Sequence, residues 1–248
     1  MQNPKKVIAC DMDGTLTESK ALLSAEMAEV LCQLLNRYFV AVVSGGAYHQ
    51  FQKQFLTQLK CAEDVLKKLF LFPVNGSTCY KYENSAWVQV YNEPLSEEER
   101  KEIISALNDA IKETGIDLSG AYGEIIEDRG SQVTFSGKGQ DAPIALKKTW
   151  DPDRTKRQAI VDIIKKRIPQ FEIRVNATSS IDINKNGIDK AYAIEKIKEI
   201  LNVTDDDIVF IGDALYKGGN DSAVKKTGVD FIQEPGPDET MEFLRQYI

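Results

Sequence analysis

Short apolar runs alternate along the chain with segments whose apolar residues recur at helical spacing. The runs are almost continuously apolar and end abruptly at polar residues. This pattern is typical of strands that are buried on both faces of a parallel sheet, with helices between them. The predicted strands cover residues 5–10, 39–43, 69–74, 208–211 and 229–233, and the predicted helices between them include 24–35 and 189–201. We therefore predict an α/β fold with a parallel sheet.

The middle of the chain has a different pattern. Ser96 followed by Glu99 is a capping box that opens an amphipathic helix. Short strands and a second helix follow, at 123–128, 132–135, 153–167, 171–175 and 179–184. An α+β segment between two halves of a parallel sheet indicates an inserted domain. We place the insert at 87–186 and a discontinuous core domain at 1–86 and 187–248.

Composition narrows the classes of function. The 31 Lys and Arg residues against 38 Asp and Glu give a net charge of −7. This balance argues against nucleic acid as a partner, because phosphate backbones are bound by clustered cations. No apolar run approaches the roughly 18 residues of a membrane span, and no signal peptide is recognisable. We expect a cytoplasmic protein with no membrane partner.

Cysteine and histidine restrict the chemistry further. The four cysteines, Cys10, Cys32, Cys61 and Cys79, form no CxxC pair. Their scattered spacing favours reduced, packed thiols over a disulfide framework. The single histidine, His49, excludes a zinc site built from several histidines. The chemistry is therefore expected to use carboxylates, hydroxyls and lysines.

Small polar side chains follow three of the predicted strands. Asp11 ends the first strand, Ser44 the second, and Asp213 follows the strand at 208–211, with Asp13 two residues beyond Asp11. Ligands of open parallel sheets bind beyond the carboxyl ends of the strands, so we expect these side chains to share one edge. Clustered carboxylates repel each other unless a cation lies between them, and an all-oxygen donor set suits Mg²⁺.

A magnesium site beside a phosphate indicates phosphoryl transfer. Asp11 can act as a nucleophile that forms an acyl phosphate. Asp13 can protonate the leaving oxygen and later deprotonate water. The Ser44 hydroxyl, the Gly45 backbone N–H and a lysine ammonium would hold the phosphoryl oxygens.

Four motifs resemble those of the haloacid dehalogenase superfamily, in the order that the superfamily has them. They are DMDGT at 11–15, SGG at 44–46, DK at 189–190 and GDALYKGGND at 212–221. The insert lies where the superfamily's type IIB (C2) cap belongs, so the resemblance implies a Rossmann-like core with an α+β cap. Segments 72–76, 126–129 and 180–190 are most similar to the eukaryotic-type phosphomannomutases and their prokaryotic phosphatase-like relatives.

The resemblance implies roles for the core residues. Asp11 becomes the nucleophile and Asp13 the acid/base. Mg²⁺ is held by Asp11, the Asp13 backbone carbonyl and Asp213. Asp221 orients a metal-bound water or the catalytic lysine, so we include it among the residues of the metal site.

The same resemblance implies how the substrate is held. Ser44 and Lys190 become phosphate ligands, and Asn220 contacts the edge of the phosphate. In the cap, Arg129 matches an arginine that holds the distal phosphate. Ser180 and Asp182 match positions that bind the sugar in the mutases.

Departures from the mutase pattern decide the predicted reaction. Where the mutases have further arginines for the second phosphate, this chain has Tyr122 and Gln140, and Lys20 stands near the start of the core. These side chains lack the planar donor fork of arginine. We predict a Mg²⁺-dependent phosphatase that acts on a phosphosugar, as a monomer or homodimer.

Two alternatives remain beside the phosphatase. The first is a phosphohexomutase, such as a phosphomannomutase, that uses the same nucleophile. The second is a non-enzymatic phospho-acceptor signalling domain, which also combines an acidic cluster, a hydroxyl and a lysine on a parallel sheet. The large insert and the DxD spacing argue against the signalling domain.

Overall fold

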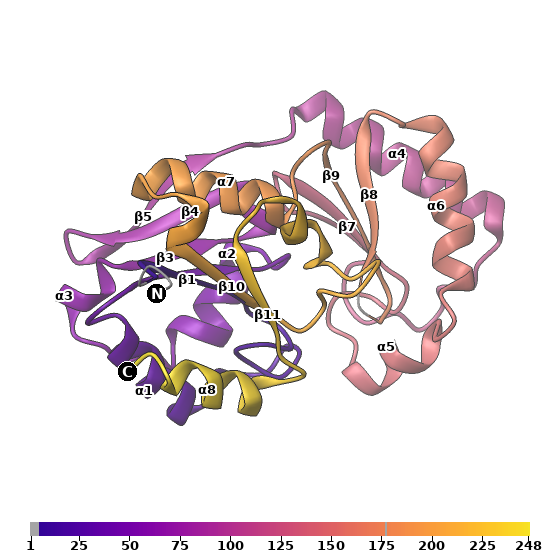
Figure 1. Cartoon of the computed structure of the whole chain (residues 1–248). Coiled ribbons are helices and arrows are strands. Elements are labelled where there is room, and N and C mark those ends of the chain that lie inside the picture. The colour runs from indigo at the N-terminus through magenta and orange to yellow at the C-terminus, as the bar shows by residue number, and fades with distance from the viewer. Residues whose placement is uncertain (1–4, 177) are drawn as a thin grey trace. The chain divides into compact units, whose positions relative to one another are not determined.

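The computed structural model describes residues 5–176 and 178–248. The chain forms two compact units. The core unit contains the residues up to Asn92 together with Ile188–Ile248, and the inserted unit, called the cap below, is Glu93–Gly187 (Figure 1). The predicted α/β fold with an inserted α+β segment is confirmed.

A seven-stranded sheet organises the core, in the order β11-β10-β1-β2-β3-β4-β5. The strands from β11 to β3 run parallel, and β4 and β5 form an antiparallel hairpin at one edge. The central strands are buried on both faces, which explains their continuous apolar sequences. The strands are β1 (Val7–Asp11), β2 (Phe39–Val43), β3 (Leu69–Phe72), β4 (Thr78–Glu83), β5 (Ala86–Asn92), β10 (Ile208–Gly212) and β11 (Asp230–Gln233).

Helices cover both faces of the core sheet (Figure 1). On one face, Ile8 and Cys10 of β1 join an apolar cluster with residues of α1 (Ala25–Leu34) and α8 (Pro237–Arg245). On the other face, Val7 and Ala9 pack in a cluster with α7 (Lys190–Leu201). Alternate residues of one strand thus serve two apolar layers. The shorter elements are α2 (Tyr48–Gln50), η1 (Phe51–Leu56), α3 (Glu63–Leu66), η2 (Val74–Gly76), η3 (Asp205–Asp207) and η4 (Ser222–Lys226).

The cap has its own antiparallel sheet and its own apolar core. The strand order is β6-β7-β9-β8. Residues of α4 and α6 pack with the apolar residues of the strands, among them Val133 and Ile183. The elements are α4 (Glu97–Thr114), β6 (Ile126–Asp128), β7 (Gln132–Ser136), α5 (Ile144–Trp150), α6 (Thr155–Arg167), β8 (Phe171–Asn176) and β9 (Ser180–Lys185). Across residues 5–176 and 178–248, no helix is long and apolar enough to cross a bilayer.

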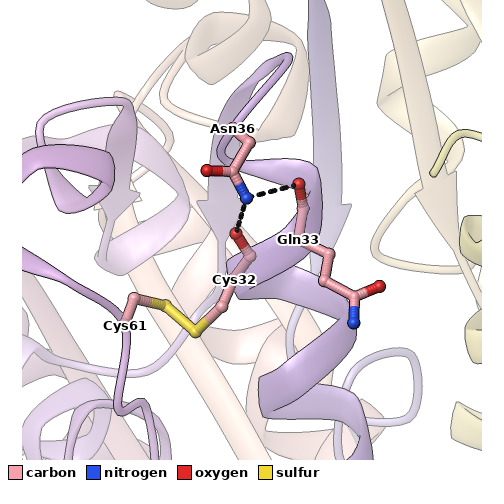
Figure 2. Close-up of a disulfide and its surroundings, with 4 residues drawn as sticks. All are labelled: Cys32, Gln33, Asn36 and Cys61. Atoms are coloured by element: carbon pink, nitrogen blue, oxygen red, sulfur yellow. Dashed lines mark hydrogen bonds between the residues drawn. A yellow bond between two sulfur atoms is a disulfide. The ribbon is translucent and has the colours of Figure 1, made fainter.

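The cysteine prediction is wrong for two of the four residues. Cys32 of α1 and Cys61, in the segment before α3, form a disulfide with their Cα atoms 5.2 Å apart (Figure 2). The Asn36 side-chain amide donates to the Cys32 carbonyl oxygen at 3.1 Å, at the end of the same helix. The two cysteines are 29 residues apart in the chain. Cys61 packs against the apolar cluster to which residues of α1 belong, and the spacing of the two cysteines carries no signal of this contact.

Candidate active site

The polar side chains that follow the central strands meet at one edge of the core sheet. Asp11, the last residue of β1, pairs in register with Val43, so Ser44 lies one residue beyond it on the neighbouring strand. On the other side, Cys10 pairs with Ile211, and Asp213 comes directly after β10. Asp11 and Ser44 are each 2% exposed. The parallel sheet therefore brings together residues from distant parts of the chain.

Lys190 joins two carboxylates at this edge. It is the first residue of α7, whose N-cap Asp189 accepts a hydrogen bond from the Tyr192 backbone N–H. The Lys190 Nζ lies 2.6 Å from Asp11 Oδ1 and also contacts Asp221 Oδ1. All three of these charged side chains are buried. One ammonium thus faces two carboxylates, which leaves an excess of negative charge.

Burial and neighbouring charges shift the pKa values of this group. Burial raises the pKa of Asp11 well above its usual range, while the nearby Lys190 ammonium opposes that rise. For Lys190, burial lowers the pKa, but the carboxylates of Asp11 and Asp221 outweigh burial and raise it. The lysine is therefore a permanent cation at the site. It favours the ionised form of Asp11, which is the form that a nucleophile requires.

Three carboxylates form a candidate metal site. Oxygens of Asp11, Asp213 and Asp221 all lie within 4.8 Å of one another. The Asp11 Oδ2 atom is buried, and among the described residues it has no hydrogen-bond partner. Burial, followed by the Asp221 charge, raises the pKa of Asp213. An all-oxygen donor set with an unused buried oxygen and excess negative charge fits a hard cation such as Mg²⁺.

The carboxylate of Asp13 does not belong to this group of three. Its Oδ1 atom accepts a hydrogen bond of 2.7 Å from the Lys20 backbone N–H. Lys20 has a left-handed backbone with φ 61°. A tight turn supports the arrangement, because the Gly14 N–H donates to the Thr17 carbonyl at 2.7 Å. Sequence reasoning considered only the side chain of Lys20, whereas the structure shows that its backbone orients Asp13.

The turn after β1 also contacts Asp213. The Thr15 hydroxyl donates a long hydrogen bond of 3.5 Å to Asp213 Oδ1. A Cβ atom at Gly14 would lie 2.7 Å from Asp213 Oδ2, and Gly14 has φ +92°. Glycine is therefore required here both for the backbone conformation and for the close approach. Thr15 belongs to the DMDGT motif, but sequence reasoning gave it no role.

Asp221 closes the loop that follows β10. Its Oδ2 atom accepts a hydrogen bond of 2.9 Å from the Ala214 backbone N–H. Its own backbone N–H donates to the Ala214 carbonyl at 3.3 Å. The predicted phosphate contact Asn220 is half-buried and directly precedes Asp221. The loop thus holds Asp221 so that its other oxygen faces Lys190.

Ser44 presents a hydroxyl whose proton is available to a ligand. Its Oγ atom accepts a hydrogen bond of 3.0 Å from the Gly46 backbone N–H, so the hydroxyl can donate elsewhere. The Asn75 backbone N–H donates to the Ser44 carbonyl at 2.8 Å. Asn75 is 4% exposed with φ 56°, and sequence reasoning did not select it. Gly45, the next residue along, is half-buried.

The predicted cap residues lie on the cap sheet and beside it. Ser180 and Asp182 alternate along β9 and therefore share one face of the sheet. Asp182 Oδ1 accepts a hydrogen bond of 2.9 Å from the Thr134 hydroxyl. Arg129, one residue beyond β6, donates twice to Glu127 Oε2, from Nε at 2.9 Å and from Nη2 at 2.7 Å. A neighbouring carboxylate thus partly neutralises the predicted distal-phosphate arginine.

Comparison with known proteins identifies the family. The profile of the haloacid dehalogenase-like hydrolases matches residues 8–222. Similar curated proteins include the phosphomannomutase of Schizosaccharomyces pombe, 27% identical over 88% of this chain and 84% of the relative. The phosphomannomutase of Saccharomyces cerevisiae is 26% identical over 99% of this chain and 95% of the relative.

Solved structures share the fold. A structure of IMP-bound IMP-nucleotidase from Plasmodium falciparum gives a TM-score of 0.72 at 15% identity, over 98% of this chain and 68% of that one. A haloacid dehalogenase-like hydrolase from Bacteroides thetaiotaomicron gives 0.66 at 15% identity, over 98% of this chain and 100% of that one. At these identities the likeness concerns the fold alone.

Proposed function

The chain belongs to the haloacid dehalogenase-like hydrolases and is close to the phosphomannomutases, and on that premise we propose that it hydrolyses a phosphosugar through a phosphoaspartate at Asp11. One observation carries the proposal. Asp11 is a buried carboxylate with one oxygen on the Lys190 ammonium and the other without a partner among the described residues. Such a carboxylate has an oxygen available for attack, and the neighbouring ammonium opposes the rise in pKa that burial causes.

The first half-reaction breaks the substrate ester. A carboxylate oxygen of Asp11 attacks phosphorus, and the bond from phosphorus to the sugar oxygen breaks with its electron pair. Asp13 donates a proton to the leaving oxygen. The Ser44 hydroxyl donates to a phosphoryl oxygen, and Lys190 supports the charge that develops near Asp11.

The second half-reaction regenerates the enzyme. Asp13, now a carboxylate, removes a proton from a water molecule that attacks phosphorus. The bond from phosphorus to the Asp11 oxygen breaks, which releases inorganic phosphate and restores both side chains. The Lys20 backbone N–H keeps the Asp13 carboxylate oriented through both proton transfers. Splitting the displacement in two lets one carboxylate pair serve both steps.

The residues that fit a metal ion are Asp11, Asp213 and Asp221, with the Asp13 backbone carbonyl implied by the family resemblance. Bound there, Mg²⁺ would neutralise charge on the transferred phosphoryl group. Thr15 supports this site by contacting Asp213. Asp221 also contacts Lys190, so the metal ligands and the catalytic lysine form one charge network.

A phosphohexomutase is the second candidate, and the curated relatives favour it, since those reported above are phosphomannomutases. A mutase must hold a second phosphate firmly while the intermediate turns over. In this cap, Glu127 already engages the Arg129 guanidinium, and Tyr122 and Gln140 replace arginines of the mutase pattern. This weaker grip on a second phosphate supports hydrolysis over phosphohexomutase activity.

Phosphorus NMR separates the two reactions. The protein is incubated with Mg²⁺ and mannose 1-phosphate, with and without a trace of hexose 1,6-bisphosphate. The phosphatase gives a growing inorganic phosphate signal that does not depend on the bisphosphate. Conversion to mannose 6-phosphate that the bisphosphate stimulates would overturn the phosphatase proposal in favour of the mutase.

A further inference from the structure

One face of the cap sheet is built from buried polar side chains. Along β7 and β9, apolar residues that enter the cap core alternate with polar residues that do not. A buried polar group is normally paired, so each of these side chains raises the question of its partner. The polar residues and their exposed fractions are Gln132 0%, Thr134 2%, Ser136 0%, Asp182 5% and Asn184 1%.

A hydrogen-bond chain fixes how the Gln132 amide is turned. The Thr134 hydroxyl has a single proton, and it donates that proton to Asp182 Oδ1 at 2.9 Å. Thr134 Oγ1 can then only accept at its other contact, with Gln132 Nε2 at 2.8 Å. The NH₂ group of Gln132 therefore faces Thr134. This polarity assigns the amide orientation, which leaves the Oε1 atom to act as an acceptor elsewhere.

Two amide oxygens on this face have no hydrogen-bond partner among the described residues. Within the described part of the chain, the buried atoms Gln132 Oε1 and Asn184 Oδ1 make no hydrogen bond. Gln132 and Asn184 are paired directly in the β7–β9 register. Directly opposed side chains have Cβ atoms about 5 Å apart. Two unsatisfied acceptors thus lie on neighbouring strands, where two donors of one ligand could reach both.

The hydrogen-bonding chemistry of the face selects the class of ligand. Glu172 of β8 pairs with Asn184 in register, and Arg174 of β8, which pairs with Asp182, donates a hydrogen bond of 3.2 Å to Glu172 Oε1. Amide oxygens only accept hydrogen bonds, and a phosphate dianion has no proton to donate, so these acceptors favour neutral donors such as hydroxyls. A sugar supplies adjacent hydroxyl groups of this kind.

We propose that Gln132 and Asn184 are specificity-determining residues that accept hydrogen bonds from hydroxyl groups on the sugar part of the substrate. Thr134 is a positioning residue, because it couples the Gln132 amide to Asp182. The inference rests on the proposed function, since it assigns the sugar of the phosphosugar to this face. A site built to accept hydroxyl donors discriminates strongly against analogues that lack them.

Direct binding tests the inference without turnover. Mannose 1-phosphate and inorganic phosphate are titrated calorimetrically, in EDTA, into the wild-type protein and into Gln132→Met. The variant is expected to bind the sugar phosphate about tenfold more weakly, the size of one lost hydrogen bond, and to bind inorganic phosphate as the wild type does. Equal losses for both ligands, or no loss for either, would overturn the inference.

Kinetics give a second readout and a matched control. The measured quantity is the ratio of kcat/KM for mannose 1-phosphate to kcat/KM for para-nitrophenyl phosphate, which lacks sugar hydroxyls. The ratio should fall about tenfold in Gln132→Met and in Asn184→Leu. The ratio should fall less in Thr134→Val, because this change only removes the hydrogen bond that orients the Gln132 amide. Gln158→Met, on the exposed surface of α6, should keep the wild-type ratio.

The two proposals fail in different ways. If the wild-type protein releases no phosphate but Gln132→Met still weakens mannose 1-phosphate binding selectively, the proposed hydrolysis is wrong and the sugar-binding face stands. If hydrolysis proceeds and the variant loses activity equally on both substrates, the sugar-binding face is wrong.

Discussion

The Nζ atom of Lys190 lies 2.6 Å from Oδ1 of Asp11, in the interior of the core unit. The same ammonium contacts Asp221, so one lysine lies between two buried acids. We therefore expect Lys190 to contribute both to the stability of the fold and to the reactivity of the site. The two contributions can be separated by experiment.

Lys190→Met is expected to destabilise the protein by about 3–5 kcal/mol, because it leaves two buried carboxylates without a cation. Urea unfolding at neutral pH in EDTA measures the free energy of unfolding. The double variant Lys190→Met/Asp221→Asn should recover part of the loss, since one uncompensated charge is gone. A single variant as stable as the wild type would contradict this account of the pair.

Asp11→Asn is expected to lower turnover by at least about a thousandfold, because the amide cannot form the acyl phosphate. The fold should persist, which circular dichroism and the unfolding midpoint would check. Asp64→Asn, at an exposed position of α3, serves as the control. Full activity in Asp11→Asn would show that the nucleophile lies elsewhere.

Asp213→Asn is expected to raise the Mg²⁺ concentration for half-maximal activity at least tenfold, because it removes one carboxylate from the metal site. Excess Mg²⁺ should restore part of the activity, and EDTA should abolish activity in the wild type. A metal titration of the phosphatase rate measures both. The control Asp206→Asn, at an exposed position, should give the wild-type Mg²⁺ titration. An unchanged titration for Asp213→Asn would show that Asp213 is not a metal ligand.

Reducing the Cys32–Cys61 disulfide is expected to lower the free energy of unfolding by about 3–4 kcal/mol, the loop-closure entropy for residues 29 apart in the chain. Urea unfolding with and without dithiothreitol measures the difference. The variant Cys32→Ala/Cys61→Ala should be insensitive to the reductant. If the wild type is equally insensitive, the two thiols are not joined in solution.

The two remaining thiols should resist alkylation in the native protein. Burial raises the pKa of Cys79 to about 12 and also raises that of Cys10. Iodoacetamide at pH 7.5 should add no mass to the native chain and two adducts after unfolding without reductant. Since the Cys79 pKa is higher in the folded state, its contribution to stability is complete below about pH 9 and is lost as the pH rises toward 12. Native labelling at pH 7.5 would contradict this burial.

Apolar runs predicted the parallel strands well because these strands are buried on both faces. The predicted strands also gave the positions of the strand ends, and therefore identified Asp11, Ser44 and Asp213 as candidate site residues. The β4–β5 hairpin was not predicted, because β4 is buried only at its first two residues, β5 is exposed or half-buried throughout, and both carry mixed polar and apolar residues. The helices α5 and α8 were also missed, being only 7 and 9 residues long.

Contacts that depend on tertiary structure left no trace in the sequence pattern. The Lys20 N–H that orients Asp13 is a backbone group, so the identity of the side chain says nothing about it. The disulfide joins α1 to a segment 29 residues further along the chain, and no sequence motif links the two cysteines. The orientation of Gln132 depends on strand register and on the direction of two hydrogen bonds.

The pairing of β1 with β10 has a consequence for how the protein is made. During translation, β1 leaves the ribosome early, whereas β10 follows only after the whole cap. The cap has its own apolar core and can fold while one edge of β1 still lacks its neighbour, and an unpaired strand edge invites pairing with other chains. Asp11 likewise lacks its cation until Lys190 has been synthesised. The nascent chain therefore carries the Asp11 carboxylate and an unpaired edge of β1 throughout the synthesis of the cap.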